Sequence, residues 1–331
     1  METRMKCALL ALGLVFLCLS GCSAADRKQT DEFYGMGTLV TVTLYGDRRA
    51  AEEGFARVRA LVAELEGLWS LNVETSDTAR LNRSDCGIPD ADGRTVALLE
   101  KAQALCAATD GNFDITLASL SALWQTCGEE NRLPTDGEIA DRLALIGTDR
   151  LELSGTSIGK PEGVTVDLGA IAKGEAVAML IRLLDGTEGL TGGLVSMGSC
   201  VAVFGGKPDG KPFRVSVRDP KDSTKTVGTL TLLPGQILSV SGDYERFVTI
   251  GGETYHHILD PRTGYPSASG LSSVAVIAED GATADALSTA FMVMGEEKTM
   301  DFRQAGVYTF EAILIRTDGT VTGTAGIGAL E

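Results

Sequence analysis

The sequence predicts an α+β fold: a single compact unit with mixed or antiparallel sheets and flanking helices. Apolar residues recur at helical spacing mainly in the first half of the chain, whereas short apolar runs typical of strands dominate the second half. Strands and helices do not alternate regularly, which argues against a doubly wound parallel sheet. No repeat, low-complexity stretch or linker interrupts residues 32–331, so we expect one domain there. A chain of 331 residues is long enough to bury a sizeable core.

The first half of this domain supplies mostly helices. Residues 38–44 alternate polar and apolar side chains, as a half-buried strand does. Residues 94–108 are expected to form a helix, and another helix starts at Thr135, where Glu138 completes a capping box. A longer helix is predicted over residues 50–69, because its apolar side chains share one stripe: Phe55, Val58, Leu61, Val62, Leu65 and Leu68.

The second half supplies mostly strands. Residues 164–168 are predicted to form a strand that feeds a Gly/Ala turn and a helix ending near Leu184. One further helix is expected over residues 282–294. The remaining apolar runs predict strands over residues 194–204, 213–217, 227–232, 237–241, 247–250, 272–278, 312–316 and 320–322.

The N-terminal segment has the pattern of an export signal. Basic residues precede an apolar run over residues 8–19, which is too short to span a bilayer. The following Leu19-Ser20-Gly21-Cys22 resembles the lipobox of bacterial lipoproteins, in which the cysteine is acylated after cleavage. We therefore expect a signal peptide over residues 1–21, lipid on Cys22, a tether over residues 22–31, and an extracytoplasmic domain anchored to the bacterial membrane. A plain secretory signal with a chance cysteine is the alternative.

Bulk charge and cysteine spacing narrow the possible partners. The net charge of −16 argues against nucleic acid, because phosphate binding needs a basic face. Beyond the N-terminal segment, Cys86, Cys106, Cys127 and Cys200 show no Cys-x-x-Cys spacing that would suggest zinc. These four cysteines allow three disulfide pairings or could all be reduced, and the sequence assigns them no role.

The chain has two histidines, and they are adjacent: His256 and His257. Any general-base step near neutral pH that uses a histidine must therefore use this pair. His257 begins the segment His-Ile-Leu-Asp-Pro-Arg-Thr-Gly. This dense setting favours function over the alternative, a surface pair in a turn. Asp260, three residues on, is a candidate to orient His257.

A carboxylate and a hydroxyl are predicted to share one face of a later helix. Asp285 and Thr289 are four residues apart in the helix expected over residues 282–294, so their oxygens point the same way. Such hard oxygen ligands suit Mg²⁺. The alternative is an aspartate favoured by the helix N-terminus beside an ordinary threonine, and on these residues alone it is the stronger reading.

The segment Asp167-Leu168-Gly169-Ala170-Ile171-Ala172-Lys173-Gly174 places small residues at the start of a helix. Small residues let a ligand approach the backbone, and a helix N-terminus favours anions. Lys173 in the first turn opposes the helix dipole unless a negative ligand is bound, which indicates a phosphate. A close-packed turn with a solvated lysine is the alternative. In Gly111-Asn112-Phe113-Asp114, Asp114 is a candidate cap for the following helix.

Taken in order, these segments resemble the ApbE-type FAD:protein FMN transferases, a family of periplasmic or surface lipoproteins. The resemblance covers nearly all of the chain after Cys22. Each motif alone is weak, but their order behind a lipobox is specific. The motifs are Met36-Gly37-Thr38, Ser76 to Asn82, Gly111 to Asp114, Asp167 to Gly174, Ser241 to Tyr244, His257 to Gly264 and Ala284 to Thr289.

The resemblance implies a Mg²⁺-dependent reaction on FAD. A serine or threonine hydroxyl of a target flavoprotein would attack, FMN would stay attached through a phosphoester, and AMP would leave. The implied acceptors are subunits of membrane redox complexes. His257, as the base, and Asp285 would be catalytic, and Asp285, Thr289 and the Ala170 carbonyl would hold Mg²⁺. The residues implied to bind FAD are Met36, Asn72, Asn112, Phe113, Asp114, Asp167, Lys173 and Ile258.

Several positions depart from the family pattern. Asn72 stands where an aromatic residue commonly packs on the flavin or adenine, and Cys200 stands where the family has an aspartate. Ile115, Ala170, Ser199 and Phe213 also differ from the usual residues. None of these changes removes an implied metal ligand or the base. An FAD pyrophosphatase, with water as the acceptor, and a flavin-binding lipoprotein without catalysis remain as alternative functions.

Overall fold

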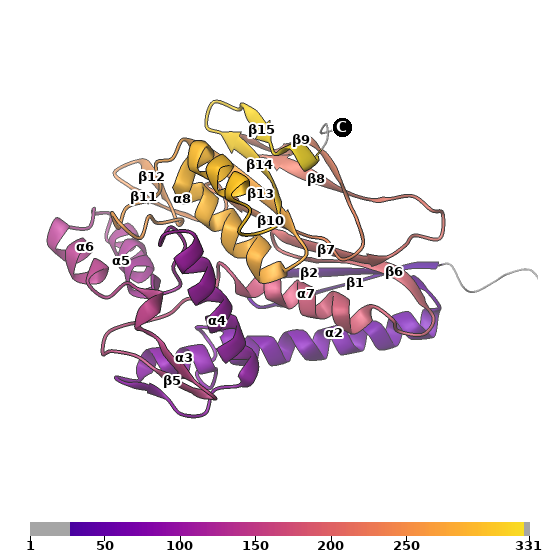
Figure 1. The fold of residues 1–331 in the computed structure, drawn as a ribbon, viewed down its shortest axis with the longest axis horizontal. Coiled ribbons are helices and arrows are strands. Elements are labelled where there is room, and N and C mark those ends of the chain that lie inside the picture. The colour runs from indigo at the N-terminus through magenta and orange to yellow at the C-terminus, as the bar shows by residue number, and fades with distance from the viewer. Residues whose placement is uncertain (1–26, 328–331) are drawn as a thin grey trace, which may run out of the picture.

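An eight-stranded antiparallel sheet forms the centre of the molecule (Figure 1). The structure is a computed structural model that describes residues 27–327. The strand order is β1-β2-β6-β7-β10-β13-β14-β15, and every neighbouring pair is antiparallel. The α+β class expected from the sequence is confirmed. The strands are β1 (Arg27–Gly35), β2 (Thr38–Gly46), β6 (Leu190–Met197), β7 (Cys200–Gly205), β10 (Ile237–Gly242), β13 (Leu271–Ala278), β14 (Glu311–Arg316) and β15 (Val321–Gly323).

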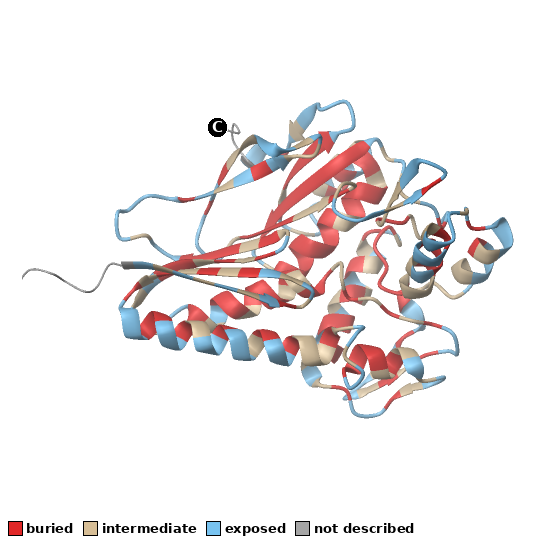
Figure 2. Ribbon diagram, turned by 180° about the vertical axis from the view of Figure 1, so that it is seen from behind, coloured by how far each residue is buried: buried red, intermediate tan, exposed pale blue. Residues whose placement is uncertain are grey.

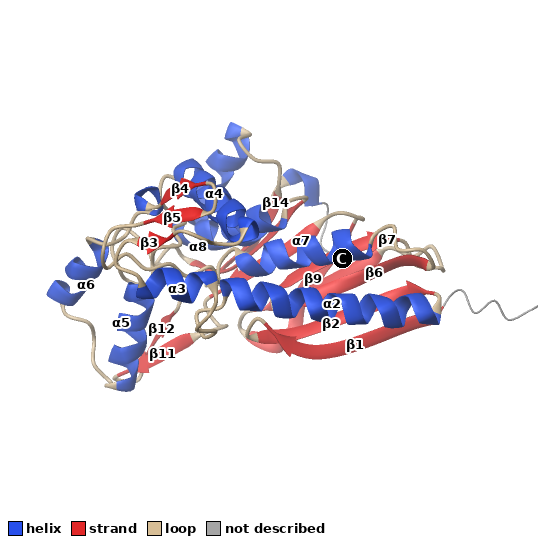
Figure 3. Ribbon diagram, turned by 90° about the horizontal axis from the view of Figure 1, so that it is seen from below, coloured by secondary structure: helices blue, strands red, loops and turns tan. Residues whose placement is uncertain are grey.

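Helices cover one face of this sheet, and a strand ribbon covers part of the other. The helices are α2 (Arg48–Trp69), α7 (Ala172–Leu184) and α8 (Gly281–Ala305), which lie side by side in Figure 3. The ribbon pairs β8 (Phe213–Asp219) with β9 (Asp222–Leu232). Figure 2 shows the buried residues concentrated in the sheet and on the helix faces turned toward it.

Strand alternation produces two cores, one on each face of the sheet. Successive side chains of a strand point to opposite faces. In β10, Ile237 therefore belongs to the core beneath the helices, whereas the next residue, Leu238, packs in the core beneath the β8–β9 ribbon. Both side chains are at most 2% exposed.

Smaller elements gather at one end of the sheet (Figures 1 and 3). A third core there joins α5, α6 and the β11–β12 hairpin, with Trp124 and Ile250 among its members. This arrangement brings segments from both halves of the chain to the same end of the sheet. The elements are α3 (Asp77–Arg83), α4 (Gly93–Ala108), α5 (Ala118–Glu129), α6 (Asp136–Leu143), β3 (Gly87–Ile88), β4 (Glu152–Ser154), β5 (Ser157–Gly159), β11 (Phe247–Ile250) and β12 (Glu253–His256).

The helices predicted in the first half are confirmed. α2 and α4 cover the ranges 50–69 and 94–108 to within two residues at each end. α6 begins with the predicted capping box, because the Thr135 side chain accepts from the Glu138 N–H while the Glu138 side chain accepts from the Thr135 N–H. Local polar patterns of this kind identify a helix start without tertiary information.

Residues 164–168, predicted as a strand, are an irregular segment instead. The alternation that suggested a strand is real, because Val164, Val166 and Leu168 are at most 1% exposed. Their backbone, however, meets a side chain. Asn82 donates to the Val166 carbonyl and accepts from the Val166 N–H, both at 2.8 Å. One amide side chain on α3 thus takes the place of a neighbouring strand.

Other boundaries and elements also differ from the prediction. Residues 194–204 form two strands rather than one, because the chain turns back at Gly198, whose φ is 58°. α8 continues beyond residue 294 to Ala305, across a break at Gly295. The sequence did not predict α3 or the strands β1, β3, β4, β5 and β12. β1 includes residues 27–31 of the segment expected as a tether.

The predicted signal peptide and the lipidation site at Cys22 lie outside the described residues. Within the described range no helix is long and apolar enough to cross a membrane. Cys86, Cys106, Cys127 and Cys200 are all free thiols.

Helices α7 and α8 approach each other closely at two glycines. A Cβ atom at Gly174 would lie 2.0 Å from the Gly281 carbonyl oxygen, and a Cβ atom at Gly281 would lie 2.0 Å from the Gly174 carbonyl oxygen. Backbone atoms cannot move aside as a flexible side chain can, so both positions require glycine. This contact brings the N-terminal turns of the two helices together.

We expect Gly174→Ala to lower the free energy of unfolding by about 1–3 kcal/mol or more, because the added methyl group overpacks a backbone contact. The measurement is urea unfolding of the purified protein. Gly67→Ala is the matched control, since Gly67 is also helical but has nothing within 4 Å of its would-be Cβ. That variant should be unchanged or gain about 0.5–1 kcal/mol. Equal stability of the two variants would contradict the close approach.

Candidate functional site

Two adjoining cavities open where the smaller elements meet the sheet. The first measures about 820 Å³ and includes the β1–β2 turn, the end of α2 and β8 in its walls. The second measures about 700 Å³ and is lined by α5, the β11–β12 hairpin and the first turns of α8. Both volumes are typical of small-molecule sites. Because the two cavities have wall residues in common, they are parts of one site: Leu71, Asn72, Asp167, Gly169, Lys173, Ser199, Val240, Glu245 and Arg246.

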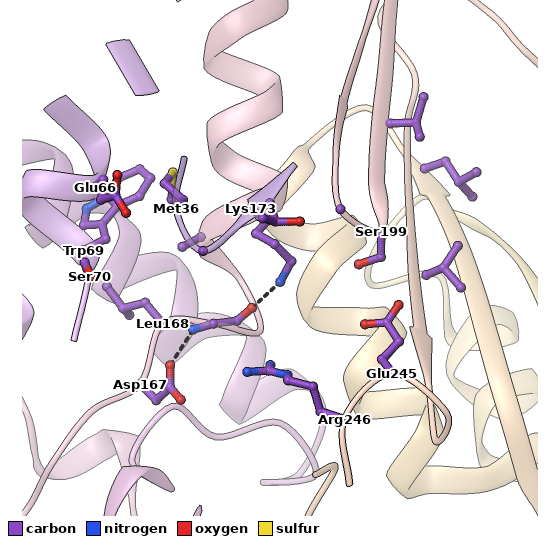
Figure 4. Close-up of a pocket in the computed structure, with 18 of the residues that line it drawn as sticks. Met36, Glu66, Trp69, Ser70, Asp167, Leu168, Lys173, Ser199, Glu245 and Arg246 are labelled. Carbon is purple, nitrogen blue, oxygen red and sulfur yellow. Dashed lines mark hydrogen bonds between the residues drawn. The ribbon is translucent and has the colours of Figure 1, made fainter. Parts of the chain in front are cut away.

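Met36 reaches the first cavity from a strained turn. Gly35 pairs with Thr38, so Met36 and Gly37 form a two-residue hairpin turn, with φ of 50° and 72°. Positive φ at both positions is the geometry that suits the twist of a hairpin. Glycine adopts it freely, whereas methionine does so only when the surroundings hold it there. The turn places Met36 in the cavity wall (Figure 4).

Lys173 lies in the first turn of α7, as predicted, and is braced by the preceding loop. Its Nζ donates to the Gly169 carbonyl at 2.6 Å, and the Gly169 N–H donates to Asp167 Oδ1 at 2.8 Å (Figure 4). Burial is the largest single influence and opposes the charge of Lys173, but the surrounding negative groups, Asp285 foremost, together raise the pKa of the ammonium group. Lys173 therefore keeps a positive charge in the wall of both cavities, with further N–H donors available.

Asp285 is 3% exposed, and groups from three elements hold its carboxylate. Oδ2 accepts from the Gly174 N–H at 2.9 Å, and Oδ1 accepts from the Ser239 hydroxyl at 2.8 Å. The Cys200 thiol donates to Oδ1 at 3.5 Å. Burial and the neighbouring carboxylate raise the pKa of this thiol far above its usual range, so Cys200 stays protonated as a donor.

The implied metal ligands line one cavity and suit magnesium chemically. Asp285, Thr289 and Ala170 all line the second cavity, and the Thr289 hydroxyl lies 3.1 Å from the Ser241 hydroxyl. Oδ2 of Asp285 accepts one hydrogen bond and keeps a second lone pair. A carboxylate, a hydroxyl and a carbonyl are the hard oxygen donors that Mg²⁺ prefers, with water or phosphate completing its shell. No cluster of three His, Cys, Asp or Glu side chains suited to a metal occurs within residues 27–327.

His257 lines the second cavity and is held in one tautomer. Its Nδ1 lies 3.0 Å from the Arg246 carbonyl oxygen, which can only accept, so the neutral ring carries its proton on Nδ1 and its free lone pair on Nε2. Burial lowers the pKa of His257 to about 4, and the positive charge of Arg246 adds to the effect. The ring is therefore neutral near pH 7. Asp260 does not orient His257, because its carboxylate accepts from Arg262 instead.

The remaining residues expected to bind FAD, apart from Met36, all line the second cavity: Asn72, Asn112, Phe113, Asp114, Asp167, Lys173 and Ile258. Asp114 does not cap the next helix, since α5 starts after Leu117 without a side-chain cap. Its carboxylate accepts from the Thr116 and Thr148 hydroxyls and so ties two loops together. Oδ1 of Asn112 is a buried acceptor without a partner among the described residues.

The part of the chain that forms this site also matches a known protein family. A sequence model described as the ApbE family matches residues 36–314. That range contains both cavities.

The chain belongs to the ApbE family.

Named relatives match over almost their whole length. FAD:protein FMN transferases of Vibrio cholerae and Treponema pallidum are each 30% identical to this chain, and the matches cover 94% and 98% of it, and 94% and 96% of the relatives. Among solved structures, the ApbE protein of Thermotoga maritima has a TM-score of 0.81 at 30% identity and covers 91% of this chain and 98% of its own. The apo flavinyl transferase ApbE of Pseudomonas stutzeri has a TM-score of 0.80 at 29% identity, with coverage of 92% and 98%.

Two residues at the centre of the site were not predicted from the sequence. Glu245 and Arg246 line both cavities, and Figure 4 shows both side chains near Lys173. They directly follow Tyr244, where the matched motif ends. Ser239 was also missed, because its role depends on β10 lying beside Asp285. Adjacency to a recognised motif was the one signal available for Glu245 and Arg246.

The pKa of His257 gives a testable pH dependence. We expect its ring proton to titrate at about pH 4 in the folded protein, against 6.5 for an unperturbed histidine. Since the unfolded chain binds the proton first, this residue stabilises the fold fully above pH 6.5, and the contribution falls away as the pH drops from 6.5 to about 4. NMR titration checks the pKa, with His257→Gln assigning the signal. A His257 midpoint near 6.5 would contradict the structure.

Proposed function

We propose that this ApbE-family protein transfers FMN from FAD to a serine or threonine hydroxyl of a target flavoprotein, with Mg²⁺ as cofactor. The names of its relatives support FAD as the donor. The observation that carries the proposal is a neutral imidazole, with its free lone pair on Nε2, in the cavity that also contains Lys173 and Asp285.

In the proposed reaction, His257 would activate the acceptor hydroxyl. An alcohol is a weak nucleophile at neutral pH and needs a base positioned to take its proton. Nε2 of His257 would take that proton while the hydroxyl oxygen forms a bond to the FMN phosphorus. The bond from that phosphorus to the AMP oxygen breaks, and AMP leaves with the bonding electrons. The product is FMN attached to the acceptor through a phosphoester.

The negative charge of the two phosphates must be neutralised for this attack. Asp285, Thr289 and the Ala170 carbonyl would hold Mg²⁺ at the second cavity, and the ion would supply charge neutralisation at the phosphates. Lys173, whose ammonium form is favoured beside Asp285, would contribute a second cation. The hydrogen bonds from Gly174 and Ser239 would keep the Asp285 carboxylate oriented.

We also propose that the protein acts outside the cytoplasm, held to the membrane by lipid on Cys22. The support is the export-signal and lipobox pattern of residues 1–22. Acceptors within membrane redox complexes would then share its compartment.

The proposed reaction is tested by AMP release. The mature domain without Cys22 is incubated with FAD and Mg²⁺, with and without a peptide or domain that carries a threonine acceptor. We expect AMP to form only with the acceptor, which gains the mass of one FMN, and EDTA to abolish both signals. AMP and free FMN without acceptor would show an FAD pyrophosphatase instead. Intact bound FAD in every tube would show a flavin-binding protein without catalysis.

We expect His257→Gln to lower the transfer rate by roughly two to four orders of magnitude while FAD remains bound, because a general base of this kind contributes about 10²–10⁴-fold. His256→Gln is the matched control, since Nε2 of His256 is engaged with the Ser267 carbonyl at 3.0 Å. Single-turnover transfer rates and flavin fluorescence separate catalysis from binding. A His257→Gln rate equal to wild type would exclude His257 as the base.

A further inference from the structure

Arg246 is a cation in the wall shared by the two cavities. It follows β10 at the turn before β11, and in Figure 4 its side chain lies in the cavity across from Lys173. Its guanidinium makes no hydrogen bond or ion pair with any residue in the described part of the chain. Several arginine side chains elsewhere in the described chain pair with carboxylates, as Arg94 does with Asp92. An unpaired guanidinium in a concave site has its donors free for a ligand.

The main chain of Arg246 already holds the proposed base. Its carbonyl oxygen accepts from the His257 N–H at 3.0 Å and lies 3.0 Å from His257 Nδ1. The charge of its side chain also acts on this ring, since it lowers the pKa of His257, so an anion bound by the guanidinium would lie near the ring. Arg246 therefore contacts the His257 ring through its carbonyl oxygen and places its own positive charge in the cavity.

The charges around Arg246 favour an anionic ligand. Lys173 is a second cation in the same wall, and both cations lower the pKa of His257 after the larger effect of burial. Burial raises the pKa of Glu245, the neighbouring carboxyl group, against the opposite influence of Lys173 and Arg246. Glu245 makes no hydrogen bond to Arg246. The Asp285 and Glu245 carboxyl groups offset part of this positive charge, but neither forms an ion pair with Arg246, so its guanidinium remains available to an anion.

We propose that Arg246 binds the phosphates of FAD together with Lys173 and positions the FMN phosphorus beside Nε2 of His257. This inference rests on the proposed function. A guanidinium matches phosphate geometry with paired N–H donors, which a lysine cannot reproduce. During transfer the hydroxyl oxygen bonds to the FMN phosphorus, its proton passes to His257, and AMP leaves as an anion. Arg246 would stabilise the charge that develops on the phosphates, as an arginine does in other phosphoryl transfers.

Binding is the first test, because it does not require turnover. FAD is titrated by flavin fluorescence into wild type, Arg246→Gln and Arg246→Lys at low and high salt. We expect Arg246→Gln to weaken FAD binding by roughly 10- to 100-fold, as for the loss of hydrogen bonds to a charged group, and to reduce the salt dependence. Arg246→Lys should restore part of the affinity. Arg57→Gln is the control, since it removes an exposed cation on α2 that lines neither cavity.

Single-turnover transfer at saturating FAD is the second test. We expect a lower rate for Arg246→Gln and an acid limb of the pH profile that moves up from about 4, because the pKa of His257 rises when the neighbouring positive charge is removed. This shift reports the charge of Arg246 beside His257, whereas the salt dependence of FAD binding reports its contact with the phosphates. Wild-type FAD affinity and salt dependence in Arg246→Gln would overturn the assignment. A wild-type protein that binds FAD but transfers no FMN would instead defeat the proposed function, and the binding comparison would still decide the role of Arg246.

Discussion

The Asp285 carboxylate is the interaction on which the site depends. It is buried, so its charge requires hydrogen-bond partners, and it finds them on the first turn of α7 and on β10. The contact from Gly174 forms only because Gly174 and Gly281 let α7 and α8 meet without side chains between them. The same contact fixes Lys173, one residue earlier in the chain, at the cavity wall. The packing of α7 against α8, the position of Lys173 and the orientation of Asp285 therefore all depend on glycine at positions 174 and 281.

In the proposed reaction, the electrostatics of the site would make His257 a weak base that is unprotonated near neutral pH. The cations that would neutralise phosphate also oppose protonation of His257, and burial opposes it more strongly. An imidazole with such a low pKa remains unprotonated across the physiological range, although its drive to take a proton is smaller than that of an ordinary histidine. The carbonyl of Arg246 compensates in part, because its hydrogen bond to Nδ1 supports the ring as it becomes charged.

Much of this site could be predicted from sequence, and the failures share one cause. His257, Lys173 and Asp285 stand in short motifs, and the resemblance of those motifs, in order, to a known family identified them, whereas the spacing around Asp285 alone favoured a structural role. The role of Ser239 depends on β10 lying beside Asp285, which sequence spacing does not show, and Arg246 was marked only by its place just after a motif. Asp260 illustrates the reverse error, since sequence proximity to His257 suggested a contact, whereas the carboxylate binds Arg262. Residues 164–168 show that alternating burial identifies buried backbone, while the strand itself requires a partner, here replaced by Asn82.

Strand β1 has a geometric consequence for the choice of acceptor. Its nine residues join the start of the described chain to the Met36 turn at the first cavity, so the strand acts as a stiff spacer about 27 Å long. If Cys22 carries lipid, the five steps from Cys22 to Arg27 add at most about 18 Å even when fully extended. The opening of the first cavity would then lie no more than roughly 45 Å above the bilayer surface. Hydroxyl groups on short loops near the membrane surface would lie within reach, and those on distant, tall domains would not.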